Sequence, residues 1–365
     1  MIAIVYPQFY GVGEIVRYLD SFLESLPDGH PKVYLITGDK NRRIARYKGV
    51  EIINVPFTSN RFSLFLWALR VRKILLQLHK QKKIQWVNLH TPPLIPGLVL
   101  PKKIPLLLTV HGTYLGMSGA FNKVRYFESP WTSIEIQLKQ LMEYFIFRRS
   151  AKTIVLNPQG QEEVLAYGYQ KQITKISKGI DVDSFKPNTS VTKDIDVLFY
   201  SGKELYKGHR AMVAVCKELI AIKPDIVICI IGDTGKDHST GYIKNNENVI
   251  LAGEVMHDEE IRLYQRSRVF ASTSYYEGLT SSCIQAMAMA LPVIVWDLLF
   301  YRNLVLDQET GVFVAVGDFE QMALQITRLL GDAANCKLLG NHARKMIVTH
   351  YSWKTISKQF FDIFV

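Results

Sequence analysis

The sequence has little of what a secreted, metal-binding or membrane-spanning protein needs. All four cysteines lie in the second half without short paired spacing: Cys216, Cys229, Cys283 and Cys336. They offer no disulfide framework, redox motif or zinc site, and we interpret them as small apolar residues in a reducing compartment. The longest apolar runs, such as 104–110 and 226–231, are far shorter than a membrane span.

The N-terminus shows no targeting peptide. Residues 1–7 read Met-Ile-Ala-Ile-Val-Tyr-Pro, which is typical of a buried strand and lacks the charged leader of a signal sequence. We therefore expect a cytoplasmic protein that is either soluble or peripherally bound at the inner face of a membrane.

Acidic residues are missing from a long part of the first half. None occurs between Glu51 and Glu128, and residues 1–187 hold 26 of the 44 Lys and Arg residues but 13 of the 33 Asp and Glu. A surface on which positive charge predominates favours an anionic partner such as a membrane or a lipid phosphate. The alternative is a basic, solvated surface with no specific partner. We expect no nucleic-acid binding, because no aromatic and basic readout motif accompanies the charge.

Strand-like apolar runs alternate with helix-length amphipathic segments along the whole chain, which indicates α/β domains with parallel sheets. The predicted strands are 2–6, 32–36, 51–55, 86–90, 105–110, 153–156, 196–200, 225–231, 249–252, 269–271 and 292–295. The predicted helices include 64–83, 134–149, a segment from 205–209 to 219, and 281–290.

The length of 365 residues, of which 48% are hydrophobic, suits two domains with separate cores. A polar stretch with a proline, 185–190, indicates a linker. We predict two doubly wound Rossmann-like domains facing across a cleft, over residues 1–187 and 188–345. An aromatic amphipathic helix in 346–365 is predicted to pack back on the N-terminal domain.

One candidate site lies in residues 274–282, Ser-Tyr-Tyr-Glu-Gly-Leu-Thr-Ser-Ser. A predicted strand ends just before it and a predicted helix begins within it, so backbone N–H groups at the helix N-terminus could bind an anion such as a diphosphate. Gly278 allows close approach of the backbone, and Glu277 could accept hydrogen bonds from sugar hydroxyls. The alternative is an ordinary capped turn between a strand and a helix.

A second candidate lies in residues 201–208, Ser-Gly-Lys-Glu-Leu-Tyr-Lys-Gly, again after a predicted strand. Lys203 and Lys207 could bring two ammonium groups to the same diphosphate and stabilise a leaving group. Taken alone, two lysines are usually solvated. Two elements suited to phosphate at equivalent strand ends of one domain favour a functional site.

These motifs belong to an ordered pattern that covers essentially the whole chain. It resembles the group 1 (family 4) glycosyltransferases, which retain anomeric configuration, use nucleotide sugars and have the GT-B fold. The segments that carry the resemblance are Tyr10-Gly11-Val12-Gly13, Thr109-Val110-His111-Gly112, 177–181, 201–208, Ile230-Ile231-Gly232-Asp233, 276–279, 285–288, 291–294 and 309–314.

The resemblance implies roles for individual residues. Glu277, at the donor sugar, His111, near the reacting centre, and Lys207, at the phosphates, would be catalytic. His90, at another strand end, has a weaker claim. The donor would be bound by Gly11, Gly13, Lys203, Lys207, Gly232, Gly278, Leu279, Thr280 and Gln285. The family needs neither a bound metal nor a cofactor.

The implied reaction is transfer of a hexosyl or acetylhexosaminyl group from a UDP- or GDP-sugar by front-side displacement. The N-terminal domain would bind the acceptor, a sugar or lipid-linked molecule in the assembly of a surface polysaccharide or glycolipid. Contact with an anionic membrane fits the charge of the first half. The alternative is a non-catalytic relative that binds a sugar or a partner protein.

The sequence departs from the family pattern at three places, of which the first and the last motivate that alternative. Gln285 stands where the family has a second glutamate, which removes a charge from the bond to the ribose. Lys203 stands where arginine is usual, which loses bidentate geometry. The sequence Trp-Asp-Leu-Leu-Phe-Tyr at 296–301 replaces a glycine-rich turn that commonly borders the donor sugar.

Overall fold

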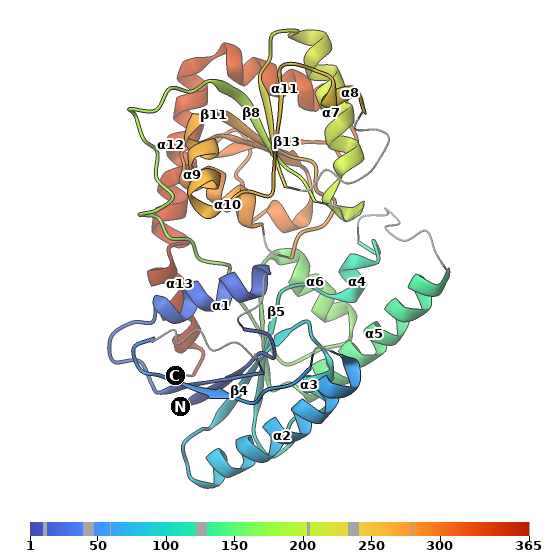
Figure 1. The fold of residues 1–365 in the computed structure, drawn as a ribbon, viewed down its shortest axis with the longest axis vertical. Coiled ribbons are helices and arrows are strands. Elements are labelled where there is room, and N and C mark those ends of the chain that lie inside the picture. The colour runs from blue at the N-terminus through green and yellow to red at the C-terminus, as the bar shows by residue number, and fades with distance from the viewer. Residues whose placement is uncertain are drawn as a thin grey trace. The chain divides into compact units, whose positions relative to one another are not determined.

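The computed structural model describes residues 1–9, 13–38, 47–58, 60–121, 130–202, 205–232, 241–278 and 280–364. Its described part divides into two compact units, each with its own parallel sheet. The first unit includes residues 1–120, 130–179 and 353–364, and the second includes 180–352. Figure 1 identifies the elements of each unit.

The first unit is a seven-stranded parallel sheet with the order β3-β2-β1-β4-β5-β6-β7. Its strands are β1 (Ile2–Val5), β2 (Val33–Thr37), β3 (Val50–Asn54), β4 (Trp86–Thr91), β5 (Leu106–Val110), β6 (Lys152–Val155) and β7 (Gln172–Lys175). Its helices are α1 (Glu14–Glu24), α2 (Arg61–Lys80), α3 (Ile95–Val99), α4 (Tyr114–Met117), α5 (Pro130–Arg149), α6 (Pro158–Ala166) and α13 (Trp353–Asp362).

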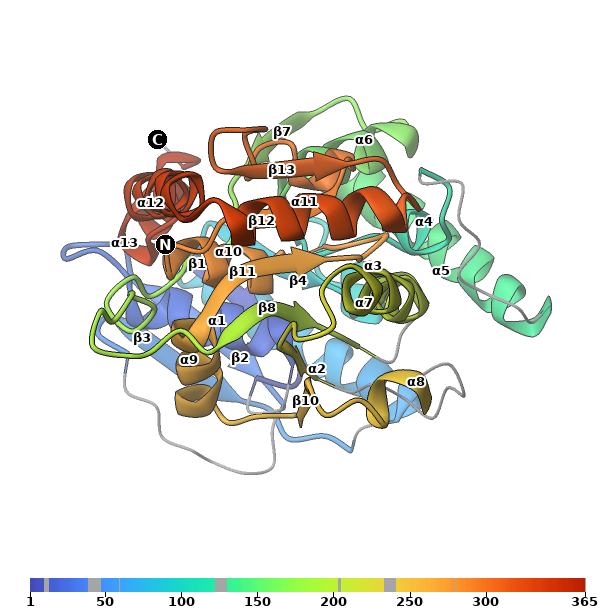
Figure 2. The same ribbon diagram turned by 90° about the horizontal axis from the view of Figure 1, so that it is seen from above.

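The second unit is a six-stranded parallel sheet with the order β10-β9-β8-β11-β12-β13 (Figure 2). Its strands are β8 (Ile195–Tyr200), β9 (Ile228–Ile231), β10 (Val249–Gly253), β11 (Ser267–Ser272), β12 (Val293–Trp296) and β13 (Gly311–Val314). Its helical segments are η1 (Leu205–Lys207), α7 (His209–Ile222), α8 (Gly241–Lys244), α9 (His257–Arg266), α10 (Ser281–Ala288), η3 (Leu299–Tyr301), α11 (Phe319–Gly331) and α12 (Ala333–His350).

Both strand orders are those of doubly wound sheets, in which the chain first builds outward on one side of its first strand and then on the other. The predicted fold class of two Rossmann-like α/β domains is confirmed. Strands β1, β2, β5 and β9 are buried at every position, as expected of parallel strands that are covered on both faces. In each sheet the order reverses beside the first strand, between β1 and β4 and between β8 and β11.

Two of the points at which the chain passes from one unit to the other are neighbours. The chain leaves the first unit at Gly179 and re-enters it at Trp353, whereas the sequence places the boundaries at 187 and 345. Phe185, within the predicted linker, is buried in the core of the second unit. In that unit Ile180 pairs with Ser352, and the Ile180 N–H donates to the Tyr351 carbonyl at 2.8 Å.

Helix α13 belongs to the first unit and packs on α1. The rings of Tyr18 and Trp353 meet edge to face at 5.1 Å between centroids, and those of Phe22 and Phe360 meet at 4.8 Å. This burial of aromatic side chains explains why the last helix returns to the first unit. Within the described residues, no helix has the length and apolar character needed to cross a bilayer.

Candidate donor site and the histidine relay

In the second unit, loops at the carboxyl ends of several strands converge at the point where strand order reverses. Gly208 has φ +70°, and a Cβ there would lie 1.9 Å from the Thr273 carbonyl oxygen, so η1 packs directly on the segment after β11. Gly232 has φ +96°, and a Cβ there would lie 2.2 Å from the Ser201 carbonyl oxygen. Such left-handed, crowded positions require glycine. Ligands of open α/β sheets bind at this kind of edge.

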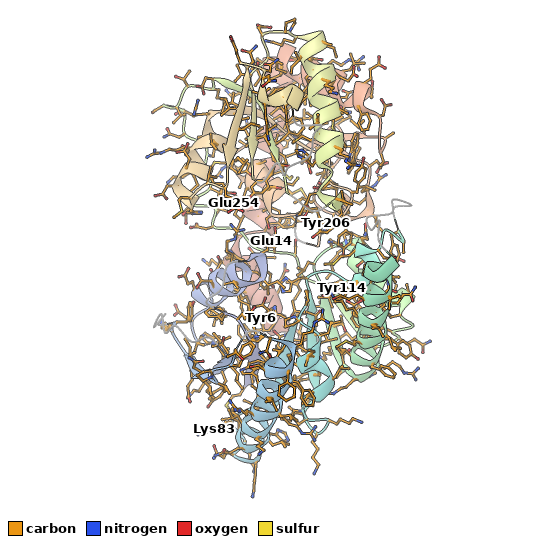
Figure 3. The ribbon with its side chains drawn as sticks, turned by 45° about the vertical axis from the view of Figure 1, so that its right-hand side comes forward. Tyr6, Glu14, Lys83, Tyr114, Tyr206 and Glu254 are labelled. Carbon is orange, nitrogen blue, oxygen red and sulfur yellow. The ribbon has the colours of Figure 1, made fainter. Side chains whose placement is uncertain are left out.

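Lys207 and Glu277 form an ion pair at this edge. Lys207 Nζ lies 2.8 Å from Glu277 Oε2, with side chains 22% and 8% exposed. The backbone brings them together, because the Tyr206 carbonyl accepts hydrogen bonds from the N–H groups of Tyr275 at 2.8 Å and Tyr276 at 3.3 Å. Tyr206 is labelled in Figure 3. Two residues that the sequence predicts as catalytic are thus in direct contact, 70 positions apart in the chain.

The segment before Glu277 rests on bulky residues at the position where the resemblance implies a glycine-rich turn. Trp296 Nε1 donates to the Thr273 carbonyl at 2.9 Å, and Tyr301 OH donates to Ser272 Oγ at 2.8 Å. Both rings are fully buried. Burial and the nearby Glu277 carboxylate raise the pKa of Tyr301, so its hydroxyl remains a donor. The sequence flagged this loop as a departure but did not predict its bracing role.

Helix α10 begins after Glu277. Thr280 is its N-cap residue, and the Thr280 side chain makes no capping hydrogen bond. Gln285 is half-buried, and its Oε1 accepts a hydrogen bond from Tyr264 OH at 3.3 Å. The predicted ribose ligand is therefore held by a neighbouring tyrosine of its own unit. Of the other predicted donor ligands, Gly278 is described beside Glu277, whereas Lys203 and Leu279 lie outside the described residues.

In the first unit, Gly13 is the N-cap residue of α1, with open space beside its Cα. Gly11 lies outside the described residues. Tyr6 and Glu14, labelled in Figure 3, stand at the end of β1 and the start of α1. The chain thus runs from the carboxyl end of the first strand to a helix N-terminus, which is the place where a Rossmann-like unit binds phosphate.

His111 follows β5 and belongs to a buried hydrogen-bonded chain. Asn88 Nδ2 donates to Thr109 Oγ1 at 2.9 Å and to the Leu107 carbonyl at 3.3 Å, so Asn88 Oδ1 faces His90. His90 Nε2 lies 2.8 Å from that oxygen, and His90 Nδ1 lies 2.7 Å from His111 Nε2. We call this chain of Asn88, His90 and His111 the histidine relay.

The relay fixes the protons on both rings. Since Asn88 Oδ1 can only accept, His90 carries its proton on Nε2 and accepts at Nδ1, so His111 donates from Nε2. His111 Nδ1 is then an unprotonated nitrogen, buried and without a hydrogen-bond partner among the described residues. Burial lowers the pKa of His90 to about 3, and burial together with His90 and Lys178 lowers that of His111 well below its usual value. Both rings are neutral.

Two buried carboxyl groups, which the sequence did not single out, hold α4 in place beside this relay. The Tyr114 N–H donates to both carboxyl oxygens of Glu143 at 3.0 Å. Thr113 Oγ1 donates to Glu163 at 2.7 Å. Burial raises the pKa of Glu143 to about 8, against the opposing effect of the Tyr167 hydroxyl bond. The sequence carried only a weak signal, because Ile146 and Phe147 lie one turn after Glu143 but Lys139 and Gln140 lie one turn before it.

Two family models match adjoining parts of the chain. The model for Glycosyltransferase Family 4 matches residues 15–184, and the model for Glycosyl transferases group 1 matches residues 181–346. Together they span both structural units, including the histidine relay in one and the Lys207–Glu277 pair in the other.

Several known proteins are similar over nearly the full length. The capsular polysaccharide biosynthesis glycosyltransferase CapM of Staphylococcus aureus is 23% identical, over 94% of this chain and 92% of that protein. A sucrose-phosphate synthase from Thermosynechococcus elongatus superposes with a TM-score of 0.79 at 20% identity, covering 100% of this chain and 98% of the other. HepE from Anabaena, solved with UDP and glucose, has a TM-score of 0.74 at 14% identity, with coverage of 100% and 98%. The chain therefore belongs to the group 1 glycosyltransferases, with a GT-B pair of Rossmann-like domains.

Proposed function

We propose that this glycosyltransferase moves a hexosyl or acetylhexosaminyl group from a nucleoside-diphosphate sugar to an acceptor with retention of anomeric configuration. The observation that carries this proposal is the Lys207–Glu277 ion pair at the carboxyl edge of the second sheet. A cation and a carboxylate in contact at the edge where an α/β sheet of this order binds ligands support a site for a nucleotide sugar.

The pair suggests a division of roles within the donor site. The Lys207 ammonium would stabilise the charge that develops on the leaving diphosphate. Glu277 would hold the Lys207 ammonium in place and accept hydrogen bonds from the donor sugar. Lys203, Gly11, Gly13, Gly232, Gly278, Leu279, Thr280 and Gln285 are the further donor ligands that we propose, and His111 is the proposed catalytic residue of the first unit.

We infer a UDP-sugar as the first donor to test and a GDP-sugar as the second. HepE, which shares the fold, was crystallised in complex with UDP and glucose, and this supports the choice of UDP. The role of CapM in capsular polysaccharide biosynthesis supports a product in polysaccharide assembly. We propose a sugar or lipid-linked acceptor, used at the inner face of a membrane, with no metal required.

Thermal stabilisation by UDP, GDP and ADP identifies the nucleotide, because a ligand that binds the folded state raises its stability. Donor hydrolysis and transfer are then measured with the matching sugars, and proton NMR of the new linkage reports its anomeric configuration. Inversion would contradict the mechanism. Binding of a nucleotide sugar without turnover of any donor would favour the non-catalytic alternative.

The site assignment is tested by Lys207→Ala and Glu277→Gln. We expect each variant to lower turnover by at least about 100-fold, since each removes a charge-assisted contact in the reacting site. Lys217→Ala, on the same unit, is the control and is expected to retain activity. Wild-type turnover in either site variant would contradict the assignment.

A further inference from the structure

Helix α5 carries an exposed apolar row along one face. Ile134, Leu138, Leu141 and Phe145 are 50%, 59%, 51% and 56% exposed. Their spacing of four, three and four residues places them on one stripe of the helix. Single exposed leucines are ordinary on a protein surface, but four large side chains in register are an apolar patch of the kind that marks an interaction site.

Helix α2 carries a second row. Phe62, Phe65, Leu66 and Leu69 are 71%, 42%, 39% and 37% exposed, whereas its other face buries Trp67, Ala68, Val71, Leu75 and Leu78 in the core. These buried side chains belong to the core of the first unit. The helix is therefore apolar on two faces, and core packing accounts for one of them.

The two rows belong to neighbouring helices of the first unit. Arg61 Nη2, at the start of α2, lies 2.6 Å from Glu135 Oε1 near the start of α5. Both helices contact α3, and Figure 1 shows the three together on one flank of the unit. We call the eight exposed side chains the α2/α5 surface: Phe62, Phe65, Leu66, Leu69, Ile134, Leu138, Leu141 and Phe145.

The α5 row ends at a basic pocket. A pocket of about 730 Å³ between α3 and α5 is lined by Gly97, Leu98, Lys102, Tyr144, Phe145, Arg148 and Arg149. Arg149 donates to the carbonyls of Gly97 and Leu100 and so supports the wall. Arg148 lies over the Tyr144 ring at 5.4 Å and donates to its hydroxyl. Lys102 and Arg148 are exposed, so their charges are accessible to a ligand.

The charges around this surface are nearly all positive. Helix α2 has no acidic residue and five lysines and arginines, namely Arg61, Arg70, Arg72, Lys73 and Lys80. The two acids of α5 are occupied, because Glu143 is buried and Glu135 is paired with Arg61 and Lys139. An apolar face rimmed by cations is the pattern of helices that lie in the plane of an anionic bilayer.

We propose that the α2/α5 surface docks the first unit on an anionic lipid bilayer, with a lipid headgroup phosphate in the pocket of Lys102 and Arg148. A second copy of the chain fits less well. A two-fold interface would place the same patch on both partners and bring the two basic rims together. The proposal agrees with a membrane-bound acceptor but does not depend on sugar transfer.

The test is sedimentation of the full chain with vesicles. Wild-type protein is expected to bind vesicles of equimolar phosphatidylcholine and phosphatidylglycerol at low salt, to bind pure phosphatidylcholine far less, and to dissociate as salt rises. Leu138→Glu with Leu141→Glu is expected to weaken binding by at least about tenfold. Lys102→Gln with Arg148→Gln is expected to weaken it by about fivefold for each cation removed.

Leu338→Glu with Val348→Glu is the matched control. These side chains are 53% and 42% exposed on α12 of the second unit, so the control also replaces two exposed apolar side chains by glutamate and is expected to bind as wild type. Equal binding of wild type to neutral and anionic vesicles would overturn the proposal, as would equal loss in the control. A dimer in light scattering that the Leu138 and Leu141 variant dissociates, without vesicle binding, would assign the surface to a second copy. Vesicle binding needs no donor, so a failed transfer assay does not affect it.

Discussion

At the scale of single residues, the most specific feature is a proton arrangement. Asn88 fixes His90, and His90 fixes His111, so that the nitrogen without a partner among the described residues, Nδ1 of His111, is an acceptor. The Asn88 side chain alone determines which ring nitrogens carry protons, because its carbonyl oxygen can accept a hydrogen bond but cannot donate one. A histidine with a fixed tautomer can orient a hydroxyl or a backbone N–H without exchanging a proton.

We predict that neither ring titrates between pH 5 and pH 8, and that His111 carries its proton on Nε2. The ¹⁵N chemical shifts of the imidazole nitrogens report both properties, with assignments from His90→Gln and His111→Gln. In the unfolded chain both histidines take up a proton as pH falls below the usual histidine pKa of 6.5, whereas in the folded chain they stay neutral. The free energy of unfolding therefore falls as pH drops below 6.5. A proton on Nδ1 of His111 would contradict the assignment.

Asn88→Leu removes the acceptor that fixes the His90 proton on Nε2 and keeps a side chain of similar size. We expect a fall in kcat of about tenfold, which is smaller than the roughly 100-fold or greater effect of an acid–base group itself, with little change in donor KM. Thr109→Val is the control for packing, because it removes the Thr109 hydroxyl that accepts from Asn88 Nδ2 and leaves Asn88 Oδ1 in contact with His90. A change confined to stability would show that the relay is structural.

The residues of both candidate sites were partly predictable. Glu277, Lys207 and His111 follow predicted strands, and family motifs mark them. Their partners were not assigned, since contacts such as Lys207 to Glu277 span 70 positions. The relay had a local signal, because Asn88 and His90 are two apart in a strand and therefore point to the same face. The contact between His90 and His111 could not be predicted, because it depends on the β4–β5 register, which places Thr109 opposite His90.

At the scale of elements, α4 depends on a carboxyl group with an unusual pKa. Glu143 binds the N–H of Tyr114 at the start of α4 and the hydroxyl of Tyr167 after α6. The folded-state pKa of about 8 is above the usual 4.5, so the folded chain keeps a proton that the unfolded chain loses. Stability from Glu143 is therefore full below pH 4.5 and is lost as pH rises through 8.

We predict that the free energy of unfolding of wild type falls relative to Glu143→Gln between pH 5 and pH 8, by up to about 1.4 kcal/mol per pH unit. Urea denaturation at several pH values measures the difference. Glu162→Gln, an exposed position on α6, is the control. A difference between wild type and Glu143→Gln that does not change with pH would contradict the raised pKa.

Most elements were predictable because buried parallel strands are continuous apolar runs. Strand β7 is the clearest exception. Its sequence Gln-Ile-Thr-Lys lies at the edge of the sheet and is only half-buried, so it lacks such a run. The boundary expected at residue 187 also differs from the one after Gly179, because Phe185 of the polar segment is buried in the core of the second unit.

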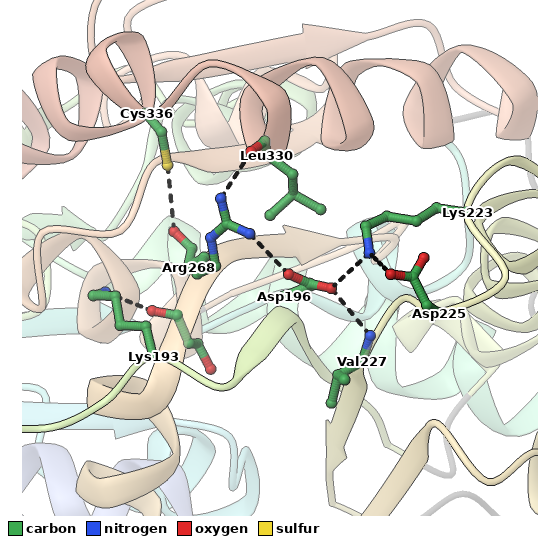
Figure 4. Close-up of polar contacts among 9 residues, drawn as sticks. Lys193, Asp196, Lys223, Asp225, Val227, Arg268, Leu330 and Cys336 are labelled. Carbon is green, nitrogen blue, oxygen red and sulfur yellow. Dashed lines mark hydrogen bonds and ion pairs between the residues drawn. The ribbon is translucent and has the colours of Figure 1, made fainter.

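At the scale of the whole molecule, an ionic network joins strands of the second sheet at their amino ends, whereas the candidate donor site lies at their carboxyl ends. Figure 4 shows the network around Asp196 at the start of β8. Its carboxylate accepts from Arg268 Nη1 at 3.0 Å and from the Val227 N–H at 3.2 Å, and Lys223 Nζ lies 3.6 Å away. These contacts tie the first residues of three neighbouring strands together.

We predict that Asp196→Ala lowers the free energy of unfolding by about 1–3 kcal/mol, because the partly exposed Arg268 and the Val227 N–H lose a charged acceptor. Turnover per folded molecule should be unchanged, since the network lies at the far edge from Lys207 and Glu277. Asp225→Ala removes the exposed partner of the same Lys223 and should leave the melting temperature near that of wild type. Equal destabilisation by both changes would show that Lys223, rather than Asp196, carries the effect.

The two crossings at Gly179 and Trp353 have a consequence for how the chain could be divided. Because Ile180 pairs with Ser352, the second unit begins and ends at adjacent points. In topology it is an insertion into the first unit, whose own sequence resumes with α13. A segment of residues 180–352 could thus be cut out with its ends already together, and a short linker could rejoin Gly179 to Trp353. The family 4 and group 1 halves would then be available as two separate modules.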